Sequence, residues 1–161
     1  MRAEYINPFI ESTVDVFKTM LGANVQRTGL SVNETFCPQY DITGIIGLSG
    51  KAHGDVVISF EADVALEATR TLMGGTYTDL DEDVVDTVGE LTNMIAGNAK
   101  TQLQSLEMSL ALPTVIVGHN HSIRFPSKVK PLSLPFHCEW GNFSIEVGLI
   151  ESPVDAHIVI G

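Results

Sequence analysis

The sequence predicts an α+β domain in which a mostly antiparallel β-sheet packs against long helices. Helical and extended patterns occur in separate blocks rather than in strict alternation. Two pairs of extended segments, at 41–60 and 132–149, are each joined through a glycine-containing turn, which indicates antiparallel hairpins. The chain has 161 residues, 44% of them hydrophobic, enough for one buried core. We expect a single domain over 1–152 and a C-terminal tail of unknown role over 153–161.

The composition excludes several classes of function. Twenty acidic against nine basic residues give a net charge of -11, which disfavours a nucleic-acid partner. No stretch is long and apolar enough to cross a membrane, and the N-terminus lacks the pattern of a signal peptide. We therefore expect a cytoplasmic protein with no membrane partner. In a reducing compartment, Cys37 and Cys138 are expected to be small core residues rather than a disulfide.

The first helix is expected to begin at Asn7-Pro8, because Asn can cap a helix and Pro suits its first position. Gly22 marks its end. The apolar residues that recur between them at helical spacing are Ile10, Val14, Phe17 and Leu21.

The next elements are a hairpin over 41–60 and a helix over 63–73 that ends at Gly74-Gly75. The hairpin turn, 49–54, is similar in composition to a phosphate-binding loop. It lacks the Walker motif's spacing, so we interpret it as a turn. A third helix is predicted over 80–106, with acidic residues at its start, where the helix dipole favours negative charge.

After Pro113 the pattern is extended again, and 115–117 is expected to be a short buried strand. Apolar residues alternate strictly over 132–140 and 143–149, which predicts two strands with one buried and one wetter face. Pro131 and Pro135 cannot donate ladder hydrogen bonds, so the first of these strands is expected at an edge or with a bulge.

The third helix carries a polar ridge opposite its apolar stripe. Asp86, Glu90, Asn93 and Gly97 follow one another by four, three and four residues and fall within roughly 60° on a helical wheel. The apolar stripe consists of Val84, Val88, Leu91, Ile95 and Leu106. The pattern by itself suits either the outer face of an amphipathic helix or a functional surface. Asn and Gly are poor residues for a helix interior, which favours the functional interpretation.

The Glu-x-x-Asn spacing alone is weak, because it recurs at Glu139 and Asn142. That second match spans the predicted hairpin turn, so its two side chains do not share a helical face. His119 and His121 could suggest a metal site, but two histidines without a third ligand are more typical of a polar strand end.

Asp86-x-x-x-Glu90-x-x-Asn93-x-x-x-Gly97 resembles the signature of the CheC/CheX/FliY family of chemotaxis phosphatases. The resemblance extends over about 5–151 and includes Ile45–Gly47, Gly54–Phe60, Met73–Gly75, Gly89–Leu91, Asn93–Met94 and Pro113–Val115. It implies a CheC-like fold with one active helix, as in CheX-like members. Val14 stands where a second motif, beginning at Glu11, would need Asn.

The resemblance implies an enzyme that hydrolyses the aspartyl phosphate of a phosphorylated CheY-like response regulator. Asn93 would orient the attacking water, and Glu90 would pair with the receiver's lysine, with a general-base role as the alternative. Asp86 would favour the helix start or lie at the rim of the contact, and Gly97 would permit close approach. The chain would need no metal of its own, with Mg²⁺ held by the receiver, and would form a homodimer. The alternative is a non-catalytic receiver-binding or assembly module of the flagellar-switch type.

Overall fold

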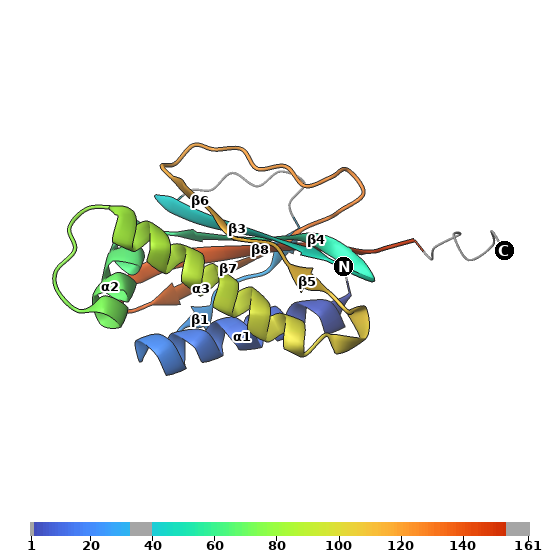
Figure 1. Ribbon diagram of the computed structural model, residues 1–161, viewed down its shortest axis with the longest axis horizontal. Helices are drawn as coiled ribbons and strands as arrows, with labels where there is room; N and C mark the ends of the chain where they lie inside the picture. The colour runs from blue at the N-terminus through green and yellow to red at the C-terminus, as the bar shows by residue number, and fades with distance from the viewer. Residues whose placement is uncertain (1, 33–39, 154–161) are drawn as a thin grey trace.

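The computed structural model describes residues 2–32 and 40–153 and contains one antiparallel β-sheet with three α-helices on one face (Figure 1). The sheet order is β1-β7-β8-β4-β3-β5, with β2 also pairing with β7 and β6 with β3. The helices are α1 (Ala3–Leu21), α2 (Ala62–Met73) and α3 (Glu82–Thr101), followed by the 3-10 turn η1 (Gln104–Leu106). The strands are β1 (Gln26–Arg27), β2 (Ser31–Val32), β3 (Ile42–Ser49), β4 (Ala52–Phe60), β5 (Ser109–Leu110), β6 (Thr114–Val117), β7 (Leu132–Cys138) and β8 (Gly141–Glu151). The predicted α+β class is confirmed.

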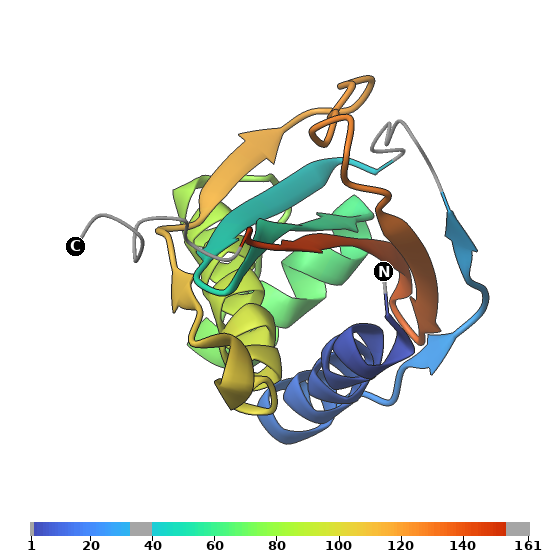
Figure 2. The ribbon, with the colours of Figure 1, turned by 90° about the vertical axis from the view of Figure 1, so that its right-hand side faces the viewer.

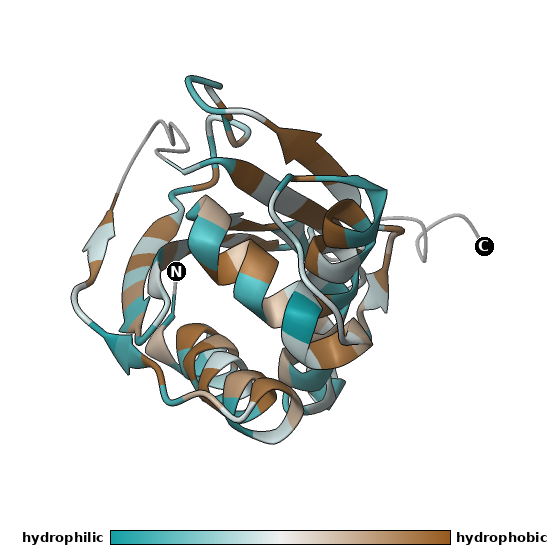
Figure 3. Ribbon diagram, turned by 90° about the vertical axis from the view of Figure 1, so that its left-hand side faces the viewer, coloured by the Kyte–Doolittle hydropathy of each residue, from teal (hydrophilic) through white to brown (hydrophobic). Residues whose placement is uncertain are grey.

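The core lies between the sheet and the helices. Phe17 of α1 stacks on Phe143 of β8, with ring centroids 4.6 Å apart, and Phe143 also stacks on Phe136 and Phe60. All four rings are almost completely buried. Hydrophilic and hydrophobic residues are interleaved along the helices, as expected when one helical face covers a core (Figure 3).

The first helix begins at Ala3, so the predicted start at Asn7-Pro8 is wrong. Tertiary contacts extend the helix past the proline, because Tyr5 and Ile6 are buried in the core. Its predicted end is correct: Gly22 has φ 63° and donates to Lys18 O, while Ala23 N donates to Phe17 O. The bond from Gly22 to Lys18 is that of an αL ending, which requires the left-handed conformation that glycine adopts easily.

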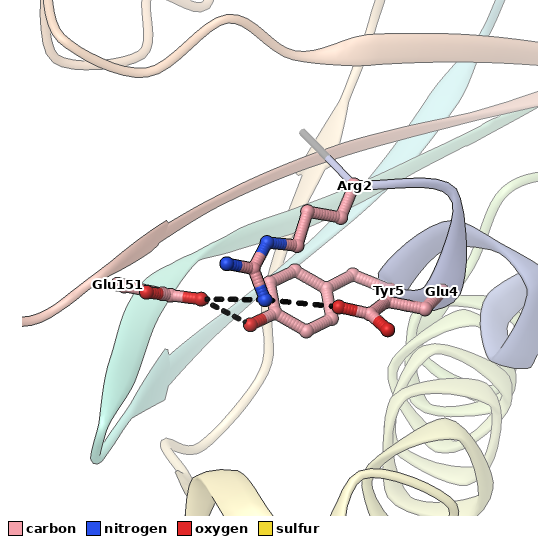
Figure 4. A network of polar contacts seen from close by, with 4 residues as sticks. All are labelled: Arg2, Glu4, Tyr5 and Glu151. Carbon is pink, nitrogen blue, oxygen red and sulfur yellow. Dashed lines mark hydrogen bonds and ion pairs between the residues drawn. The ribbon is translucent and has the colours of Figure 1, made fainter.

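A polar network fastens the start of α1 to the end of β8 (Figure 4). The Tyr5 hydroxyl donates to Glu151 Oε1, which also lies 3.3 Å from the Arg2 guanidinium. The same guanidinium lies 3.0 Å from Glu4 and above the Tyr5 ring. The hydrogen bond to Glu151 is the main cause of a raised Tyr5 pKa. The two sequence-distant segments are thereby held together at one end of the sheet.

The helix over 82–101 is capped at its start by Asp81, whose carboxylate accepts from Val84 N at 3.1 Å. Its apolar stripe is buried as predicted, since Val84, Val88, Leu91 and Ile95 have no exposed surface. The helix ends at Thr101, however, and not at the predicted 106. Leu106 is buried from the separate turn η1, which returns the chain toward β5.

The two predicted hairpins are present as β3–β4 and β7–β8. Pro135 lies in β7 opposite Ser144 of β8. On the other side of β7, the pairing with short strands is interrupted at this residue. Strand β1 pairs with His137 and Phe136, whereas β2 pairs with Ser133 and Leu132. The predicted edge location of β7 is therefore wrong, because β1 and β2 lie outside it (Figure 2). Pro135 is tolerated because it falls between these two short strands, where no ladder donor is required.

Two burial predictions are wrong. The strand β6, expected to be buried, is a hydrophobic strand at the edge of the sheet, with Val117 49% exposed (Figure 3). The expected wetter face of β8 is buried: Ser144 and Glu146 are covered although they point away from the helices. The segment 118–131 crosses that face, and its Phe125 and Val129 pack against Val57 (Figure 1).

No helix among the described residues is long and apolar enough to cross a bilayer. Cys138 is buried and forms no disulfide with any residue that the structure describes. Cys37 lies outside the described residues, as does all of the expected tail beyond Pro153.

Candidate active site

Three of the four predicted site residues line one open groove beside α3. Asp86 and Glu90 are exposed and Asn93 is half-buried. The groove has a volume of about 530 Å³, and its second wall is formed by Leu112, Pro113 and Val115. Glu90 and Asn93 are one helical turn apart, so a carboxylate and a carboxamide stand side by side at a surface that another protein can reach.

A glycine in the sheet determines how closely α3 packs against the sheet. Gly44 of β3 faces Thr92, and a Cβ at this position would overlap the Thr92 side chain. Thr92 is buried and donates its hydroxyl to Val88 O at 2.7 Å. Since Thr92 directly precedes Asn93, this close approach fixes how far the carboxamide stands from the sheet.

Two further contacts hold the same stretch of helix. Gly89 faces β6, where a Cβ would lie 3.6 Å from Val115 Cγ2, an ordinary packing distance. On the other side, Ser12 Oγ of α1 donates to Ile95 O at 2.7 Å, and this hydrogen bond is buried. The helix that presents Glu90 and Asn93 is thus fixed by the sheet, by the edge strand and by α1, so its side chains are preorganised.

Gly97 does not line the groove. It is half-buried near Leu110 of β5, whose Cδ1 would lie 3.6 Å from an added Cβ. Its predicted role in permitting close approach by a partner stays a prediction. The structure brings Asp86, Glu90 and Asn93 together and leaves Gly97 one turn farther along α3.

The groove is acidic on its helical side. Its lining includes Asp86 and Glu90 and contains no basic residue. Neither carboxylate takes part in an ion pair within the part of the chain that the structure describes. Both are therefore available to a cation supplied by a partner. The opposite wall is apolar, and sequence reasoning did not include it in the site.

The first helix presents Glu11 and Val14 to solvent, the positions of the expected degenerate motif. Valine has no group that can hold a water molecule, so the expectation of a single active helix stays a prediction based on side-chain chemistry.

The other residues considered as site candidates make structural contacts. Asn142, part of the second Glu-x-x-Asn match, donates to Glu61 Oε1 at 3.0 Å and contacts His137 across the β7–β8 hairpin. His119 Nδ1 lies 3.4 Å from Asp41 Oδ1. Over residues 2–32 and 40–153, no three His, Cys, Asp or Glu side chains are grouped in a way that could hold a metal ion. The segment 49–54 forms the β3–β4 turn, as predicted.

Comparison with known proteins identifies relatives of this chain. The sequence is 29% identical over 127 residues to the CheY-P phosphatase CheX of Thermotoga maritima, covering 77% of this chain and 82% of that protein. The crystal structure of the chemotaxis protein CheX from Vibrio vulnificus is 33% identical and covers 92% of this chain and all of its own (100%), with a TM-score of 0.85. A CheX–CheY–BeF3–Mg²⁺ complex from Borrelia burgdorferi contains a chain with the same fold, 23% identical with a TM-score of 0.69, covering 93% of this chain and 100% of its own.

The family model described as chemotaxis phosphatase CheX matches residues 42–137, which include β3, β4, α2, α3 and both walls of the groove. Together with the antiparallel sheet and the single Glu-x-x-Asn helix, the match establishes that this chain belongs to the CheX family of chemotaxis phosphatases.

Proposed function

We propose that this protein hydrolyses the aspartyl phosphate of a CheY-like response regulator. The observation that carries the proposal is the placement of Glu90 and Asn93 side by side in one accessible groove. Membership of a phosphatase family supports it, and so does the activity for which the Thermotoga relative is named.

Asn93 holds the attacking water in this mechanism. An acyl phosphate is already reactive, and the receiver contributes Mg²⁺ and its own cations, so the remaining task is to orient water in line with the leaving carboxylate oxygen. A carboxamide can accept from the water through C=O and donate through NH₂, and it does not titrate. The protein contributes orientation and needs no metal ligand of its own for this step.

Glu90 docks the helix by pairing with the receiver's active-site lysine, and Asp86 adds negative charge at the rim of the same contact. Both carboxylates line the groove, and neither forms an ion pair with a basic residue in the described part of the chain. Gly97 lies one turn beyond the groove, and the role proposed for it, close approach of the partner's backbone, rests on the family resemblance. General-base chemistry at Glu90 is a weaker alternative, since an exposed Glu is a poor base.

The test is to mix the protein with a phosphorylated CheY-like receiver and Mg²⁺ and to follow phosphate release. Release faster than the receiver's own rate supports the proposal. Binding to the phosphorylated receiver without acceleration would instead support the non-catalytic receiver-binding or assembly module.

Replacing Glu90 with Gln is expected to raise KM for the phosphorylated receiver by about tenfold, because it removes one partner of an interfacial ion pair, with a smaller change in kcat. The matched control is Glu82→Gln, an exposed position in the first turn of the same helix. The effect of Glu90→Gln should shrink as salt screens the pair. A loss confined to kcat, with a new pH dependence, would favour the general-base alternative.

We also infer that the chain acts as a homodimer in the cytoplasm, with 1–152 as one folded domain. The resemblance to CheX-like proteins supports dimerisation. Sedimentation equilibrium is expected to give the mass of two chains, and a single-chain mass at micromolar concentration would contradict the inference.

A further inference from the structure

The apolar wall of the groove contains an unusually exposed side chain. Leu112 is 89% exposed, more than any other large hydrophobic side chain among the described residues, the next being Val32 at 60%. It lies between β5 and β6, directly across the groove from Glu90 and Asn93. Isolated exposed leucines are common, but this one stands beside the proposed reaction site.

Backbone contacts on both sides of Leu112 hold it at the surface. Immediately before it, Ala111 N donates to Gly47 O at 2.9 Å. Two residues after it, Thr114 pairs with Ile45 of the same strand, β3. Pro113 lies between these anchor points and fixes its own φ angle. The leucine therefore cannot turn into the core, and its side chain is held out at the rim of the groove.

The two walls of the groove have complementary chemistry for one kind of partner. The helical wall has two carboxylates, Asp86 and Glu90, which form no ion pair with the described residues and suit a cation. Leu112, Pro113 and Val115 of the other wall suit an apolar surface. A partner that fills the groove must present a cationic side chain and, next to it, an apolar patch. A phosphorylated receiver, with a lysine at its phosphorylation site, meets the first requirement.

We propose that Leu112 is an apolar anchor that holds the phosphorylated receiver against α3 by burying its side chain in the receiver's surface beside the lysine. The inference rests on the proposed function and assigns it a second docking element. Leu112 binds and does not take part in the chemistry, so its contribution is to KM and not to kcat. Because the backbone is anchored at Ala111 and Thr114, the conformational freedom lost on burial is mainly that of the leucine side chain.

The experiment compares Leu112→Ser with Leu112→Met, which keeps an apolar side chain, and with Leu30→Ser, at another exposed leucine (56%) between β1 and β2 at the opposite edge of the sheet. Leu112→Ser is expected to raise KM for the phosphorylated receiver by about tenfold with kcat unchanged, since an anchor that fills a pocket carries a large share of the binding energy. Leu112→Met and Leu30→Ser should both stay within about twofold of the parent chain, the level expected for positions outside an energetic centre.

A second measurement separates this contact from the ion pair of Glu90. Affinity for a receiver treated with beryllofluoride, a stable phosphate mimic, is measured at low and high ionic strength. The loss in Leu112→Ser should be the same at both, because burial of apolar surface is not screened by salt, whereas the loss in Glu90→Gln should fade.

Failure of the inference and failure of the proposed function give different results. If the parent chain does not accelerate phosphate release, the proposed function is wrong, and the beryllofluoride affinities still report on Leu112. If the parent chain accelerates release and Leu112→Ser has the parental KM and affinity, the anchor is wrong and the phosphatase stands. A drop in kcat at constant KM would also overturn the anchor.

Discussion

Asn93→Ala is expected to lower kcat for phosphate release by about 100-fold or more, because a reaction that depends on the orientation of one water loses its catalysis when the orienting group is removed. The affinity for a beryllofluoride-treated receiver should remain near that of the parent chain, since Glu90 and the rest of the groove are intact. Single-turnover phosphate release with excess protein measures the chemical step directly.

Asn98→Ala is the matched control, since it removes an exposed asparagine from the same helix outside the groove. Asn93→Asp provides a second comparison: it keeps the acceptor oxygens but loses the NH₂ donor and adds a charge beside the phosphoryl group. We expect it to be as impaired as the alanine variant. Parental turnover in Asn93→Ala would show that another group orients the water and would remove the basis for the mechanism.

The helical part of the site was predictable from the sequence because it depends on local periodicity. Once 80–106 is interpreted as a helix, the spacing of Asp86, Glu90 and Asn93 places them on one face, and the buried stripe is found where the wheel places it. The spacing of these residues did not predict the function of that face. The assignment to water positioning came from the resemblance to a family.

The second wall of the groove depends on long-range pairing and could not be placed in the same way. Leu112 and Pro113 reach α3 only because β6 pairs with β3, far earlier in the sequence, through contacts such as Val115 with Gly44. The segment Pro113–Val115 was among the residues that carry the family resemblance, which was a signal for its importance. The prediction that 115–117 is a buried strand followed from composition alone, and the position of β6 at the edge of the sheet overrides composition.

Local rules also failed where tertiary contacts changed the surroundings of an element. The capping pattern at Asn7-Pro8 was outweighed by the burial of Tyr5 and Ile6, which extends α1 to Ala3. Alternation in β8 correctly predicted which residues share a face. It could not reveal that the second face is covered by 118–131, since that cover comes from a segment without regular periodicity.

This covered face of the sheet contains a buried carboxyl group. Glu146 of β8 has no exposed surface, and neither carboxylate oxygen has a hydrogen-bond partner within residues 2–32 and 40–153. Its neighbours across the sheet are Val57 and Ser133. Burial raises the pKa of Glu146 from 4.5 to about 7, and a weaker attraction from the Ser133 hydroxyl acts in the opposite direction. The folded protein therefore holds a proton on Glu146 at pH values where the unfolded chain has lost it.

Glu146→Gln is accordingly expected to stabilise the protein at pH 8 and to have little effect near pH 5. The raised pKa means that the parent chain loses stability as the pH rises from 4.5 to about 7, and that the full penalty is present above that range. Glutamine resembles the protonated acid and never ionises, so the difference in unfolding free energy should grow by roughly 2 kcal/mol between about pH 5 and pH 8.

Urea denaturation at both pH values measures this difference, with Glu139→Gln as the control at an exposed position in the β7–β8 turn. A difference that does not change with pH would mean that Glu146 is ionised or solvated in the folded state. In the expected case, burial beneath segment 118–131 is what keeps the proton on Glu146 up to about pH 7.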